Sequence, residues 1–128
     1  MTVRSRPISP HLQIYRWTIT MAMSIAHRAT GIALYAGTVL LVIWLGAAAS
    51  SQQALNVVND IYASWFGQLV LFAYTWALFH HMLGGIRHFI WDFTIGMLPG
   101  QREMLAWANL IGSIVLTVLV WTVFVWTA

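Results

Sequence analysis

The chain contains no cysteine and no lysine, and charged residues make up only 7% of its 128 positions. Without cysteine, disulfides, thiolate iron–sulfur ligation and covalent c-type haem attachment are all excluded. A soluble surface normally carries about a quarter charged residues. A chain that is 60% hydrophobic and so poor in charge is therefore a membrane protein. The net charge of +3 rests on scattered arginines rather than on a basic cluster, so nucleic acid is not an expected partner.

Three long apolar segments predict three transmembrane helices in a single domain that covers the whole chain. Each segment is about the length that crosses roughly 30 Å of hydrocarbon, and tyrosine and tryptophan lie near several ends, as in interfacial belts. We therefore expect an all-α membrane protein, with an interfacial lead over 1–20, spans at about 22–49, 62–90 and 104–127, and a polar connection over 50–61.

The arginines predict how the chain lies in the bilayer. Three of them precede the first span and a fourth lies near its start, whereas the segment 50–61 carries only Asp60. Positive charge favours the cytoplasmic side, so we expect a cytoplasmic amino terminus. The lead over 6–17 should lie along that interface as a membrane anchor or as a docking surface for a soluble partner. Because the start resembles neither a cleavable signal nor a transit segment, we expect a multi-pass protein of a bacterial inner membrane.

The stretch 80–92, HHMLGGIRHFIWD, places three histidines and two charges at the end of a hydrophobic run. Ionisable groups at membrane depth are costly and are candidates for a functional site. On a helix, His81 and His88 lie about two turns or roughly 10 Å apart along one face. Gly84 and Gly85 lie between them and leave a shallow strip. A flat group such as haem suits this strip, and histidine is its commonest axial ligand.

Neighbouring side chains on a helix point about 100° apart, so only one of His80 and His81 can bind a given iron. The spacing favours His81, because Gly85 lies one turn further along the same face. His88 is closer to the interface, where it suits a haem propionate or a proton path. Ligation by His88 stays open on spacing alone, and so does the role of His80.

A second polar cluster opens the first span, where Ser24, His27, Arg28 and Gly31 fall on one side of a helix. A hydroxyl, an imidazole and a guanidinium can together bind a polar head group, haem propionates or a quinone carbonyl. The alternative is an arginine that snorkels to the interface and a serine bonded to its own helix. Because the second span carries its histidines to the same depth, we expect the two clusters to form one site.

These motifs resemble the cytochrome b556 subunits of succinate dehydrogenase, the family of the larger membrane anchor of respiratory complex II. The resemblance rests on the segments 6–17 and 21–31, on Gly-Ile-Arg-His over 85–88 and on Trp-Asp over 91–92. It runs in order and spacing from about residue 6 to 95, and the third span matches only as a hydrophobic helix.

The resemblance implies a haem b that this chain holds by one axial ligand, His81. The other axial ligand is then supplied by a second, small membrane anchor subunit. His27 and His88 lie near the haem propionates in this reading, and Arg87 is also among the cofactor-binding residues. His80 has no counterpart in the family pattern.

The resemblance further implies that Ser24 and Arg28 contribute to a ubiquinone pocket, with Asp92 in its outer shell. The chain is then not catalytic alone. It serves a succinate:ubiquinone oxidoreductase, in the respiratory chain and the tricarboxylic acid cycle, together with a flavoprotein subunit and an iron–sulfur subunit. Two alternatives stay open: the anchor of a quinol:fumarate reductase, and a haem-free structural anchor whose histidines only bond across helices.

Overall fold

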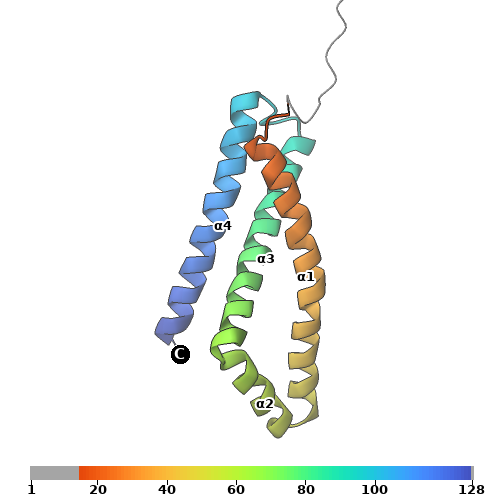
Figure 1. Ribbon diagram of the computed structural model, residues 1–128, viewed down its shortest axis with the longest axis vertical. Helices are drawn as coiled ribbons and strands as arrows, with labels where there is room; N and C mark the ends of the chain where they lie inside the picture. Colours follow the sequence, from red (N-terminus) through yellow and green to blue (C-terminus); the bar gives the residue numbers. More distant parts are fainter. Residues whose placement is uncertain (1–14, 128) are drawn as a thin grey trace, which may run out of the picture.

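The computed structural model describes the backbone of residues 15–127 and the side chains as far as residue 124. The predicted all-α fold with three membrane-spanning helices is confirmed, because α1, α3 and α4 are long and apolar enough to cross a bilayer. The interfacial lead falls mainly on residues 1–14, outside the described part, and the cytoplasmic amino terminus stays a prediction. The helices in chain order are α1 (Ile19–Ser50), α2 (Gln52–Ala63), α3 (Trp65–Asp92) and α4 (Pro99–Thr127) (Figure 1).

The connection predicted over 50–61 is wrong as a loop, because most of it forms the helix α2. A serine stands at each end of this helix. The side chain of Ser51 accepts a hydrogen bond from the backbone N–H of Ala54 at 3.1 Å, and that of Ser64 accepts from Gly67 at 3.1 Å. Each hydroxyl satisfies a backbone donor that a helix start leaves unpaired. The chain therefore changes direction at Ser51 and again at Ser64, and the backbone N–H groups of Ala54 and Gly67 still have hydrogen-bond partners.

Two spans begin earlier than the apolar runs predicted. Helix α1 starts at Ile19, where the side chain of Thr18 accepts from the backbone N–H of Met21 at 3.4 Å. Helix α4 starts at Pro99, a position whose missing N–H would have had no helical partner. Caps and turn residues, rather than hydrophobicity, thus set these boundaries.

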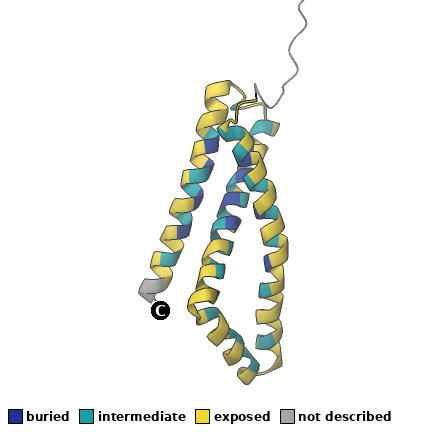
Figure 2. Cartoon of the chain, viewed as in Figure 1, coloured by how far each residue is buried: buried dark blue, intermediate teal, exposed yellow. Residues whose placement is uncertain are grey.

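Helix α3 lies between α1 and α4 and contacts both, while α2 lies at the end of the bundle far from the start of α1 (Figure 1). Buried positions gather on the facing sides of the three long helices, and the outer surfaces are exposed (Figure 2). In a bilayer such an outer surface meets lipid or partner helices, and small or polar residues hold helices together. The buried polar side chains of the described part are Thr30, His80, Arg87, Asn109, Ser113 and Thr117.

Helices α1 and α3 make close contact at Gly37, which is buried against the ring of Tyr74. A methyl group at residue 37 would overlap that ring, whereas Gly46 of the same helix has no atom within 4 Å of such a methyl. Alanine raises helix propensity at both positions by about 1 kcal/mol, so this gain cancels in a comparison of the two variants. Overpacking costs about 1–3 kcal/mol. We expect Gly37→Ala to unfold at a lower temperature than Gly46→Ala when the purified proteins are heated in detergent; equal stabilities would contradict this packing.

Candidate functional site

His81 lies on the side of α3 that meets α1. Its Nδ1 is 3.0 Å from the backbone carbonyl oxygen of His27, and the hydroxyl of Thr30 is 3.4 Å from the same nitrogen. A carbonyl oxygen only accepts, so Nδ1 carries the proton, and in the neutral ring Nε2 keeps its lone pair. The ring rests over Gly31, where a Cβ would lie 3.0 Å from its Cε1. Helix α1 therefore fixes the orientation of His81 and leaves Nε2 available.

The imidazole of His27 joins the two histidine motifs. It stacks on His81 with ring centroids 3.9 Å apart and meets the ring of His88 edge-on at 5.3 Å. Gly84 makes room for it, because a side chain there would overlap the His27 ring. Its Nε2 is buried and has no hydrogen-bond partner in the described part of the chain. The structure thus brings together three histidines from α1 and α3.

Arg87 is buried at the end of α3 nearest this cluster, with 3% of its surface exposed. Its guanidinium carbon lies 5.1 Å from the centroid of the Trp91 ring, which in turn meets His88 edge-on at 5.3 Å. Nε and Nη1 of Arg87 have no hydrogen-bond partner among residues 15–127. A buried cation without an acceptor is costly, so this arrangement suits an anionic group from outside the chain.

The cluster predicted on one side of α1 divides between two directions. His27 and Gly31 face α3, whereas Ser24 and Arg28 are exposed. At about 100° per residue, the four positions span an arc of about 100° around the helix axis. An arc of this width is wide enough for residues at its two edges to face different neighbours. Within the described part neither Ser24 nor Arg28 has a hydrogen bond or ion pair, and the same holds for the exposed Asp92.

His80 points away from this cluster and is fully buried against α4. Its Nδ1 lies 3.4 Å from the hydroxyl oxygen of Ser113, and both ring nitrogens lie 3.4 Å from the amide nitrogen of Asn109. Sequence reasoning did not single out these α4 residues. Their signal was a polar side chain every four residues, at 109, 113 and 117, within an apolar helix.

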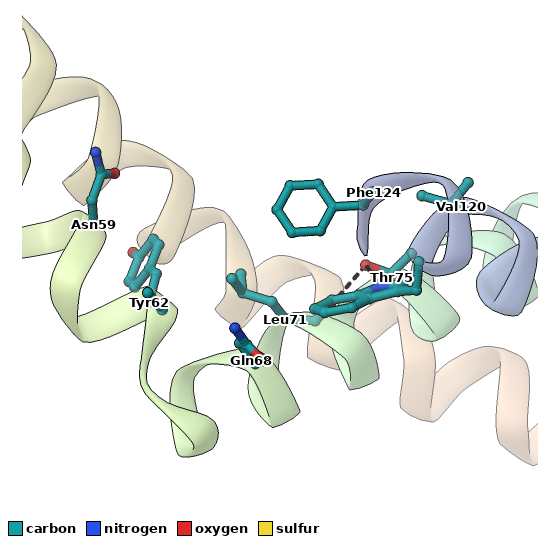
Figure 3. Close-up of a pocket in the computed structure, with 9 residues that line it drawn as sticks. Asn59, Tyr62, Gln68, Leu71, Thr75, Val120 and Phe124 are labelled. Atoms are coloured by element: carbon teal, nitrogen blue, oxygen red, sulfur yellow. Dashed lines mark hydrogen bonds between the residues drawn. The ribbon is translucent and has the colours of Figure 1, made fainter. Parts of the chain in front are cut away.

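A cavity of about 490 Å³ lies at the far end of the molecule, between α2, α3 and α4 (Figure 3). Tyr62 at its edge donates to the carbonyl oxygen of Leu40 at 2.7 Å, and the indole N–H of Trp121 donates to the hydroxyl of Thr75 at 3.3 Å. Its described lining includes no histidine and no charged side chain. This cavity is therefore separate from the histidine cluster.

The described residues include no group of three or more histidine, cysteine, aspartate or glutamate side chains arranged to hold a metal ion. What α1 and α3 present is a single imidazole with a fixed tautomer, beside buried donors that have no acceptor. Such an arrangement can supply one ligand to an iron whose other ligands come from elsewhere, and it can bind carboxylates next to it.

Comparisons with known proteins agree with this geometry. Residues 2–120 match the family described as "Succinate dehydrogenase/Fumarate reductase transmembrane subunit". A Paracoccus denitrificans protein named "Succinate dehydrogenase cytochrome b556 subunit" is 42% identical over 120 residues, or 94% of this chain and 92% of the relative. A Rickettsia conorii protein of the same name is 35% identical over 116 residues, or 91% and 90% of the two chains. A Bos taurus "Succinate dehydrogenase cytochrome b560 subunit, mitochondrial" is 37% identical over 123 residues, or 92% and 69%.

Proposed function

Because the chain belongs to the family of succinate dehydrogenase/fumarate reductase transmembrane subunits, we propose that it holds a haem b and part of a ubiquinone site in a succinate:ubiquinone oxidoreductase, respiratory complex II. Its three spanning helices suit a membrane anchor, and the bacterial relatives favour a bacterial inner membrane. The single observation that carries the haem proposal is the His81 ring, whose Nδ1 donates to the His27 carbonyl while Nε2 has no hydrogen-bond partner among the described residues.

The residues around His81 fit a haem. Histidines that bind metals usually donate their other N–H to a carbonyl or carboxylate, as His81 donates to the His27 carbonyl. Propionates would accept hydrogen bonds from the unpaired nitrogens of His27 and Arg87, with His88 beside them. His81 Nε2 would therefore bind the haem iron, and the partner anchor subunit would supply the iron's other protein ligand. When bound, the haem takes up and releases single electrons.

The position of His80 supports the choice of His81. The ring of His80 is fully buried against α4, and both of its nitrogens lie near Asn109. A ligand at this position would have to leave those contacts and turn about 100° around α3. His81 already lies on the side of α3 that carries the histidine cluster.

We place ubiquinone against the outward face of α1 that carries Ser24 and Arg28. Both side chains are exposed in the single chain and have no described partner, so they are free to bind a ligand there. The Ser24 hydroxyl would donate a hydrogen bond to a quinone carbonyl. The Arg28 guanidinium would stabilise the negative charge that develops on the oxygen during reduction. Asp92, exposed at the end of α3, would lie in the outer part of this pocket.

In this assignment the chain performs no catalysis alone. A flavoprotein subunit oxidises succinate, and an iron–sulfur subunit carries the electrons to the membrane. This chain and a second small anchor bind the quinone and hold the soluble pair at the bilayer.

The proposal is tested by purifying the complex through a tag on this chain and recording a dithionite-reduced minus oxidised spectrum. We expect a b-type haem band together with a flavoprotein, an iron–sulfur protein and a second small membrane subunit. Co-purified subunits without haem would instead establish a structural anchor. Because the family description also covers fumarate reductase, turnover with succinate and with fumarate then decides the direction of the reaction.

A further inference from the structure

A group of polar side chains joins α3 to α4 on a side of α3 that lies about 100° around the helix from the histidine cluster. We call His80, Asn109 and Ser113 the α3–α4 polar contact. His80 and Ser113 are completely buried, and Asn109 is 4% exposed. Polar groups at such depth are costly unless they are paired, so a contact of this kind has one preferred arrangement rather than many.

The hydrogen bonds within this contact are directional. The Ser113 hydroxyl donates to the carbonyl oxygen of Leu110 at 2.8 Å, so its oxygen is left to accept. His80 Nδ1, at 3.4 Å from that oxygen, is then the donor. The amide nitrogen of Asn109, at 3.4 Å from His80 Nε2, donates to the unprotonated side of the ring. One tautomer of His80 therefore donates to the Ser113 oxygen and accepts from the Asn109 amide nitrogen, so the ring is held at both nitrogens, while Asn109 Oδ1 has no hydrogen-bond partner in the described part of the chain.

A fixed side-chain direction at His80 also fixes the side-chain direction of His81. Successive side chains on a helix are about 100° apart, so a fixed direction for His80 fixes that of His81. The tip of a side chain lies about 6 Å from the helix axis, so a rotation of α3 by only about 10° would move His81 by about 1 Å. A displacement of about 1 Å is enough to spoil the geometry of a metal or cofactor site.

We propose that His80 is a positioning residue for the haem ligand: its contact with Asn109 and Ser113 of α4 fixes the rotation of α3 that presents His81 to the haem. The inference rests on the proposed function, because it requires His81 to be the ligand. It adds α4, which contributes no residue to the histidine cluster, to the elements that determine the haem environment.

The test uses variants in the complete complex. Ser113→Ala and Asn109→Leu each remove one partner of His80. Thr117→Val is the matched control, because Thr117 is 1% exposed in the same helix interface but its hydroxyl donates only to the Ser113 carbonyl oxygen. His80→Leu removes the contact entirely, and His80→Gln keeps one donor and one acceptor. The measurements are the haem-to-flavin ratio and the low-spin EPR signal of the oxidised haem, which depends on the planes of its axial imidazoles.

We expect the EPR signal to shift or broaden in Ser113→Ala and Asn109→Leu and to stay unchanged in Thr117→Val. His80→Leu should lose haem relative to flavin, and His80→Gln should regain much of it. The proposal is overturned if Ser113→Ala and Asn109→Leu give the wild-type signal, even where His80→Leu fails to assemble, since His80 would then serve packing alone. An unchanged haem spectrum in His81→Ala would instead contradict the assignment of His81 as the haem ligand, on which this inference rests.

Discussion

Replacing His81 with alanine abolishes the b-type absorption band of the purified complex. Alanine has no atom that can reach a haem iron, and the other two histidines of the cluster do not offer a substitute. The ring of His27 is enclosed between His81 and Gly84, and His88 lies about two turns further along α3. We expect near-complete loss of haem per flavin, measured from the dithionite-reduced minus oxidised spectrum and the flavin content of the same sample.

Met82→Leu is the control for this experiment. Met82 follows His81 in the chain and is 45% exposed, so the change alters the same turn of α3 while nearly conserving volume. Its haem band should be that of the unaltered complex. If the band persisted in His81→Ala and disappeared in His88→Ala, the ligand would be His88, the alternative that spacing in the sequence left open.

Arg28→Leu lowers the reduction of ubiquinone by succinate on the order of 10²-fold, the usual effect of removing one donor that stabilises a developing negative charge. Oxidation of succinate by an artificial acceptor at the flavin should stay unchanged, because Arg28 lies on the outer face of a membrane helix. Both rates are measured on the same complex and expressed per flavin.

Two further arginine variants make the result specific. Arg28→Lys keeps the positive charge but loses the planar fork of donors, so its quinone activity should fall between that of Arg28→Leu and that of the unaltered complex. Arg102→Leu removes an exposed arginine from the first turns of α4 and should leave both activities unchanged. Full quinone activity in Arg28→Leu would show that this guanidinium snorkels to the interface and does not serve the substrate.

The three spans could be predicted because the length of each hydrophobic segment identifies it, whereas α2 can be recognised only from its capping residues and its helical periodicity. The segment 50–61 is too polar to cross a bilayer, so its composition predicts a connection. Its signals were the serines at both ends and the spacing of Leu55, Val58 and Tyr62, the half-buried side chains of one helix face. A short amphipathic helix within a membrane protein is thus found from caps and periodicity rather than from hydropathy.

For the candidate site, the sequence predicted that the motifs of α1 and α3 would form one site, and in the structure His27 of α1 stacks on His81 of α3. It did not predict how the cluster on α1 divides, with His27 inward and Arg28 outward. Residues one position apart differ by about 100°, and only the placement of the neighbouring helix decides which of them is covered. The partners of His80 could not be predicted from the sequence either, because pairing between α3 and α4 depends on the register of two separate helices.

The polar contact between α3 and α4 also bears on how the chain enters the membrane during its synthesis. Helix α3 is the least apolar of the three spans, and it carries both His80 and Arg87. An arginine costs about 2.5–3.5 kcal/mol at the centre of an inserting helix and less towards its end, where Arg87 lies, and an unpaired imidazole at His80 adds to this cost. The side chains that pair with His80 are made after α3, on α4. We therefore view α3 and α4 as a helical hairpin that inserts into the bilayer as one unit, in which α4 stabilises α3.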